Sequence, residues 1–62
     1  MPYTVIFLIE SEVETTYEIQ HVETERAAML AQPTIQKTAN LIVRTILPGY
    51  HDESEAIAEL LD

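Results

Sequence analysis

The segment TIQKTANLIVRTIL, residues Thr34 to Leu47, is the longest patterned stretch of the chain and decides how the rest folds. At 3.6 residues per turn, several of its apolar side chains fall on one line, which predicts an amphipathic helix with a core-facing stripe. The residues on this line are Ile35, Ala39, Ile42 and Ile46. Lys37 and Arg44 would lie on the polar back of the same helix.

A strand over Leu41 to Leu47 is the alternative for this segment. Ile, Val and Thr have restricted side-chain torsions and suit strands better than helices. In a strand, however, Arg44 would lie between Ile42 and Ile46 on one face. We therefore prefer the helix, and leave open whether Thr24 to Leu47 forms two helices or one that is kinked at Pro33.

The N-terminal third predicts two strands. Tyr3 to Ile9 is β-branched and aromatic and is apolar on both faces, as in a strand that is covered on two sides. Val13 to Val22 alternates between apolar and polar residues, which predicts a half-exposed strand whose polar face meets water or a basic partner. Residues 10–12 form the expected turn between them.

Two further helices are predicted from their capping residues. Thr24 can cap a short helix that runs to about Ala31. After the turn at Pro48 and Gly49, Asp52 and Glu55 have the spacing of a capping box that begins a helix from Glu53 to about Leu61. The predicted fold is one α+β domain over residues 1–62, a β-hairpin packed on two or three helices in the order ββααα.

The length of the chain predicts self-association. Sixty-two residues are few for one apolar core, and the chain has no cysteine for a disulfide or thiolate metal site. A two-stranded sheet would also leave the apolar strand Tyr3 to Ile9 at an edge. We therefore predict a homodimer in which the sheet continues across a two-fold axis or apolar helix faces meet. The expected core and dimer residues are Tyr3, Val5, Phe7, Ile35, Ile42 and Ile46.

The charge of the chain points to a basic protein partner. The net charge is −8, which disfavours nucleic acid and anionic membranes as direct partners. All three cations lie within residues 26–51, which contain no acid, and the acids lie on either side. Such a field steers encounters with a cationic surface. The acids that we expect to make this contact are Glu14, Glu18, Glu53, Glu55 and Glu59.

No residue pattern predicts catalysis, a metal or a cofactor. The group His51, Asp52, Glu53 and Glu55 is interpreted as helix capping, and His21 with Glu23 and Glu25 as surface residues. Ser11 and Ser54 have no neighbouring histidine, and one glycine excludes a glycine-rich phosphate loop. The chain carries no recognisable targeting segment, so we expect a cytoplasmic, non-enzymatic protein. Tyr17 and Tyr50 are candidates for interface anchors or for residues that close the core edge.

Three short motifs resemble landmarks of HicB-type antitoxins: the opening YTVIF, the following TYEIQ, and LPGY before the helix ESEAIAEL. That family opens with a similar strand and carries an LPGC-like turn before a Glu-rich helix. The chain departs from it at Tyr50, where the family usually has Cys, and in residues 23–46. The acidic charge allows an alternative function, an inhibitor or antitoxin whose carboxylates imitate phosphates at the cationic nucleic-acid site of an enzyme. The resemblance supports the antitoxin form of this alternative. A structural subunit or assembly factor is the second alternative.

Overall fold

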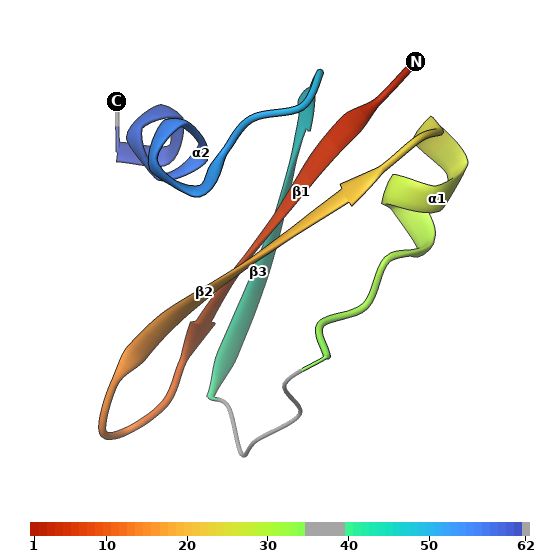
Figure 1. The fold of residues 1–62 in the computed structure, drawn as a ribbon. Coiled ribbons are helices and arrows are strands. Elements are labelled where there is room, and N and C mark those ends of the chain that lie inside the picture. The colour runs from red at the N-terminus through yellow and green to blue at the C-terminus, as the bar shows by residue number, and fades with distance from the viewer. Residues whose placement is uncertain (35–39, 62) are drawn as a thin grey trace.

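The computed structural model describes residues 1–34 and 40–61. Their elements follow the order β1 (Tyr3–Glu10), β2 (Thr15–Val22), α1 (Glu25–Leu30), β3 (Leu41–Pro48) and α2 (Glu53–Leu61) (Figure 1). The α+β class predicted from the sequence is confirmed. The element order ββαβα differs from the expected ββααα because a third strand occupies the place of the central helix.

The sheet is antiparallel with the strand order β2-β1-β3, so β1 lies in the centre. Both neighbours pair with β1 along eight residues, and Phe7 lies opposite Glu18 on one side and Arg44 on the other. A central strand has no free edge, which suits the apolar run from Val5 to Ile9 in β1. The chain itself therefore supplies the second neighbour that we expected from a dimer partner.

One face of the sheet carries the main apolar core. Val5, Phe7 and Ile9 project from β1 to this face and form a buried cluster with Ala28 of α1. Alanine at this contact lets the short helix approach the sheet closely. Partly buried side chains complete the cluster at its margin, and they are Tyr3, Val22, Ala31 and Ile46.

The opposite face is covered at the end where β1 begins. Thr4 and Ile6 project to this face and are fully buried. The chain reaches this face after β3 and continues into α2, whose Ala56 is also fully buried (Figure 1). The expectation that β1 is covered on both sides is thus confirmed within one chain.

The predicted helix over Thr34 to Leu47 is wrong for its second half. Leu41–Pro48 is a strand, and Ile42, Arg44 and Ile46 share one face, as in the alternative that we set aside. The objection to that alternative was the charge of Arg44. Its guanidinium reaches past the apolar side chains and donates from Nη1 to the Met29 carbonyl oxygen near the end of α1, at 2.6 Å. Ile35 and Ala39 lie outside the described residues.

The local turn and cap signals were largely correct. The Thr24 hydroxyl accepts from the Ala27 amide at 3.0 Å, as expected of an N-cap, and α1 ends at Leu30 before Pro33. The hairpin turn lies one residue later than expected, since the Ser11 amide donates to the Glu14 carbonyl at 2.9 Å across Glu12 and Val13. In the described ranges, neither helix has the length and apolar character needed to cross a membrane.

Candidate functional site

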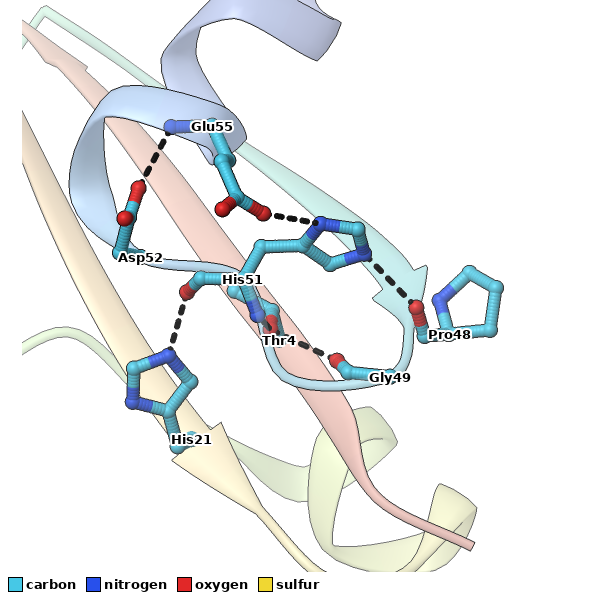
Figure 2. A network of polar contacts seen from close by, with 7 residues as sticks. All are labelled: Thr4, His21, Pro48, Gly49, His51, Asp52 and Glu55. Atoms are coloured by element: carbon cyan, nitrogen blue, oxygen red, sulfur yellow. Dashed lines mark hydrogen bonds and ion pairs between the residues drawn. The ribbon is translucent and has the colours of Figure 1, made fainter.

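The turn between β3 and α2 is fixed to the sheet by Thr4. This threonine is fully buried, and its hydroxyl donates to the Gly49 carbonyl at 2.8 Å and accepts from the His51 amide at 2.9 Å (Figure 2). The Gly49 amide also donates to the Pro2 carbonyl at 2.8 Å. Gly49 has a φ of 85°, a conformation that glycine adopts without steric cost. Together these contacts give the turn one defined path.

Two histidines add side-chain contacts to the same turn. His51 Nε2 lies 2.9 Å from the Pro48 carbonyl, and His21 Nε2 lies 2.6 Å from the His51 carbonyl (Figure 2). Carbonyl oxygens only accept, so both Nε2 atoms carry the proton. His51 Nδ1 is 3.5 Å from a carboxylate oxygen of Glu55, a contact that is an ion pair only when this nitrogen is also protonated. Both histidine side chains thus stabilise the turn through hydrogen bonds to its backbone carbonyls.

Asp52 begins α2 as its sequence position predicted. Its Oδ1 accepts from the Glu55 amide at 2.8 Å, which is the N-cap half of a capping box. The Glu55 carboxylate faces His51 (Figure 2), where a full capping box would turn it back to the Asp52 amide. The interpretation of this acidic group as helix capping is therefore confirmed for Asp52.

Tyr50 is displayed at the surface of this fixed turn. Its side chain is 56% exposed. Its ring meets the ring of His21 edge to face, with centroids 5.3 Å apart and an interplanar angle of 69°. An exposed tyrosine on a well-fixed backbone loses little entropy when it is covered by a partner. Tyr17, the other candidate anchor, is half-buried in β2.

The five acids predicted to contact a partner lie in three separate places. Glu53, Glu55 and Glu59 are all exposed on α2. Glu14 is exposed in the hairpin turn directly before β2, and Glu18 lies opposite Phe7 on the face that carries α1. The structure thus places three of these acids on α2 and separates them from Glu14 and Glu18. At 3.6 residues per turn, Glu55 and Glu59 lie on one side of α2 and Glu53 projects from another.

Glu18 has a contact role that the sequence did not reveal. Its carboxylate accepts from the Thr34 amide, at 3.1 and 2.9 Å, and from the Thr34 hydroxyl at 2.8 Å. Gln20, two residues along the same face, donates to the Gln32 carbonyl at 2.8 Å. We expected the polar face of β2 to meet water or a partner. Instead, two of its side chains hydrogen-bond to the segment that follows α1, at Gln32 and Thr34. The alternation along β2 predicted that both side chains share a face, but it could not predict that this is the face of the sheet that carries α1.

Thr4 was also missed at the sequence level. In the sequence it is only a polar residue within a mainly apolar strand, on the same face as Ile6. A hydroxyl in the middle of a buried strand must find partners, and this requirement is the signal that could have found it. In the described parts of the chain, no buried side-chain nitrogen or oxygen lacks a hydrogen bond. The network therefore satisfies its own polar groups while it holds the turn.

The turn held by Thr4 carries exposed side chains that a partner could contact. Among the described residues, no three His, Asp or Glu side chains gather in a way that could hold a metal ion. What the site presents outward is the ring of Tyr50 and the carboxylates of α2, directly after it in the chain. Comparison with known proteins gave no matching family, no matching curated protein and no matching solved structure. The resemblance to HicB-type antitoxins therefore rests on the short motifs alone.

Proposed function

We propose that this chain is a small, non-enzymatic, self-associating interaction module whose helix α2 binds a basic protein surface. The observation that carries the proposal is the placement of Glu53, Glu55 and Glu59, all exposed on one helix, directly after the exposed Tyr50. The turn that joins them is fixed by buried Thr4. A partner would thus meet carboxylates and an aromatic ring whose positions are already set.

The chemistry of this surface suits lysine and arginine side chains. Exposed carboxylates attract cations over several ångströms and speed the encounter, an effect that falls as salt is added. A tyrosine ring accepts a cation over its face, and an interfacial tyrosine surrounded by polar groups is a common binding hot spot. Exposed ion pairs contribute up to about 1 kcal/mol each, so the loss of three of them should weaken a complex substantially. Contact with the ring of Tyr50 would add to the affinity that the carboxylates supply.

The proposal is tested by capture of partners from the native host with the tagged chain. The test variant is E53Q/E55Q/E59Q, which neutralises the acids of α2. The matched control is E12Q/E23Q/E25Q, which changes the net charge equally at exposed acids outside α2. Glutamine avoids placing a cation at the N-terminus of α2, which the helix dipole would disfavour. Circular dichroism checks that both variants fold.

We expect the wild-type chain and the control variant to retain the same basic protein, and the α2 variant to lose it. The retained complex should dissociate on addition of salt. Tyr50→Ala should weaken the complex with the helix acids intact. Equal losses in both triple variants would show that only net charge matters and would contradict a site on α2. Retention of proteins without a cationic surface would contradict the proposed partner.

The antitoxin or inhibitor interpretation is a special case of this function. In that case the captured protein binds nucleic acid through the cationic surface that α2 covers. The strand–turn–helix order of LPGY and the Glu-rich helix agrees with the landmarks on which the resemblance rests. Nucleic acid should then compete with the chain for its partner, whereas a partner of another kind should bind nucleic acid and the chain independently.

A further inference from the structure

Strand β3 leaves an apolar edge of the sheet uncovered. Leu41, Ile42 and Val43 are 48%, 45% and 41% exposed, although all three belong to a strand paired with β1. Arg44 follows them and is also exposed. Long apolar edge strands without protecting charges or bulges are pairing sites, and proteins normally avoid leaving them bare.

The direction of the free backbone groups on β3 follows from two hydrogen bonds. The Ser11 amide bonds to Glu14 across the β1–β2 hairpin, and the Gly49 amide bonds to Pro2 across the β1–β3 pair. Antiparallel ladders alternate between hydrogen-bonded and non-hydrogen-bonded pairs. Odd residues of β1 therefore bond to β2 and even residues to β3. On β3 this leaves the N–H and C=O groups of Ile42, Arg44 and Ile46 pointing away from the sheet.

The charge distribution favours a second copy of this chain at that edge. Two chains of charge −8 repel each other wherever their acids meet. Residues 26–51 contain no acid, and β3 within them carries one cation. This edge is thus where two copies can approach with the least repulsion.

The molecule also has more surface than its mass requires. Its accessible surface is 4450 Å², whereas a folded monomer of this mass is expected to expose about 4000 Å². Its Cα atoms extend over 36 × 24 × 13 Å, so it is a thin slab. Joining two slabs edge to edge would cover the exposed apolar strand without stacking the acidic helices.

We propose that two copies pair β3 with β3 of the partner, antiparallel, with Val43 facing its own copy at the two-fold axis. The result is a continuous six-stranded sheet. This inference rests on the self-association included in the proposed function and names the surface that carries it. The ladder bonds would join Ile42 to Arg44 of the partner copy, and each is repeated by symmetry.

The register follows from the outward groups and from Arg44. Only pairings that bring outward groups together form a ladder, so the axis must lie on a residue and not between two residues. An axis at Arg44 would place two guanidiniums directly opposite, which is destabilising. An axis at Ile42 would pair only the first three residues of β3. An axis at Thr45 would leave the exposed Leu41 unpaired and would place Pro48, which has no N–H to donate, opposite Ile42. The Val43 axis pairs Leu41 to Thr45, and it is the longest register that both includes all three exposed apolar residues and separates the two arginines.

Cysteine cross-linking tests the register, because the chain has no cysteine of its own. At the axis, two Val43→Cys residues would form a non-hydrogen-bonded pair with Cα atoms about 4.5 Å apart, which a disulfide can span. Val13→Cys is the matched control, since Val13 is 92% exposed in the hairpin turn. We expect rapid disulfide dimers for Val43→Cys and slow ones for Val13→Cys. Equal rates, or faster dimers for Leu41→Cys than for Val43→Cys, would overturn the register.

Sedimentation equilibrium from micromolar to millimolar concentration tests the interface itself. We expect a wild-type dimer and a dimer dissociation constant raised about tenfold or more by Val43→Lys, which places two ammonium groups together. Circular dichroism confirms that the variant folds. A dimer that resists Val43→Lys would overturn β3 pairing but leave self-association standing. A wild-type monomer throughout would overturn both. E53Q/E55Q/E59Q should leave this constant nearly unchanged, which separates the dimer from the basic-partner site.

Discussion

Strands β2 and β3 pair with the same central strand, yet they are held to the rest of the chain in different ways. β2 carries side chains that bond elsewhere in the fold: Glu18 to Thr34, Gln20 to Gln32 and His21 to the His51 carbonyl. On β3, Arg44 bonds to Met29, while Leu41 to Val43 remain exposed. One edge is fastened by polar contacts within the chain, and the other presents apolar surface.

The contrast between β2 and β3 indicates which contacts stabilise this small chain. A 62-residue domain has a free energy of unfolding of about 3 to 9 kcal/mol. The central strand and the polar contacts of β2 must supply most of this within one copy. The apolar start of β3 adds little until something covers it. Variants in the three strands should therefore differ in a graded way, measured by urea unfolding at one fixed protein concentration because self-association adds stability.

The largest effect is expected in the strand that both edges share. Phe7 is 2% exposed and lies between Glu18 and Arg44. Phe7→Ala should lower the free energy of unfolding by about 3 to 5 kcal/mol, because it creates a cavity in the only large apolar cluster described. At the lower end of the expected stability range, this change would leave the chain mostly unfolded. Val13→Ala, at an exposed position, should change stability by less than about 0.5 kcal/mol. A folded Phe7→Ala variant with near wild-type stability would contradict the central role of β1.

A smaller loss is expected from Thr4→Val, which keeps the shape of the side chain and removes its hydroxyl. The Gly49 carbonyl and the His51 amide would each lose a partner in a part-buried setting. Such a loss costs about 1 to 3 kcal/mol. The His51 amide should also exchange its hydrogen faster, and Thr4→Ser should restore both properties in part. Unchanged exchange at His51 would show that the turn is held by other contacts.

The next effect tests the polar fastening of β2. Glu18→Gln weakens the charge-assisted bonds to Thr34, and we expect a loss of about 1 kcal/mol because the contact is partly open to water. Hydrogen exchange at the Thr34 amide should become faster. Glu14→Gln is the control, since Glu14 is exposed in the hairpin turn directly before β2. Equal effects of the two variants on Thr34 would indicate that only net charge matters.

The sequence predicted those parts of the fold that depend on local chemistry. β1 followed from its apolar, β-branched residues, β2 from its alternation, and both helix starts from Thr24 and Asp52. For the candidate site, the exposed acids of α2 and their capping residue were found in advance. These features depend on residues that are close in sequence, so the amino-acid sequence alone is enough to predict them.

The parts that failed depend on contacts between distant residues. The segment Leu41–Pro48 carries both a helical spacing and strand-forming residues, and pairing with β1 decides between them. The partners of Thr4 lie more than forty residues away, and those of Glu18 lie on the crossover to β3. The charge of Arg44 led us to reject the strand. Its hydrogen-bond partner is the Met29 carbonyl oxygen, which no sequence pattern identifies.

The smallest effect concerns that arginine. Arg44→Met removes the bond from Nη1 to the Met29 carbonyl, 2.6 Å long in the structure, at the C-terminal end of α1. A cation at this end of a helix contributes about 0.3 to 1 kcal/mol at an exposed site, so the free energy of unfolding should fall by about 0.5 kcal/mol. Amide exchange should rise in α1 and stay constant in β3.

Arg44→Lys is the matched variant for this contact, because it keeps the charge and loses the reach of the guanidinium. We expect it to restore part of the protection of α1. In the proposed dimer Arg44 faces Ile42 of the partner copy, so methionine there should not weaken the dimer and would extend its apolar contact. Faster exchange in β3 of Arg44→Met would mean that the arginine holds the strand, and not the helix. In that case polar side chains would hold both edge strands, β2 and β3, to the rest of the chain. The exposure of Leu41 to Val43 could then not be explained by a lack of such contacts on β3.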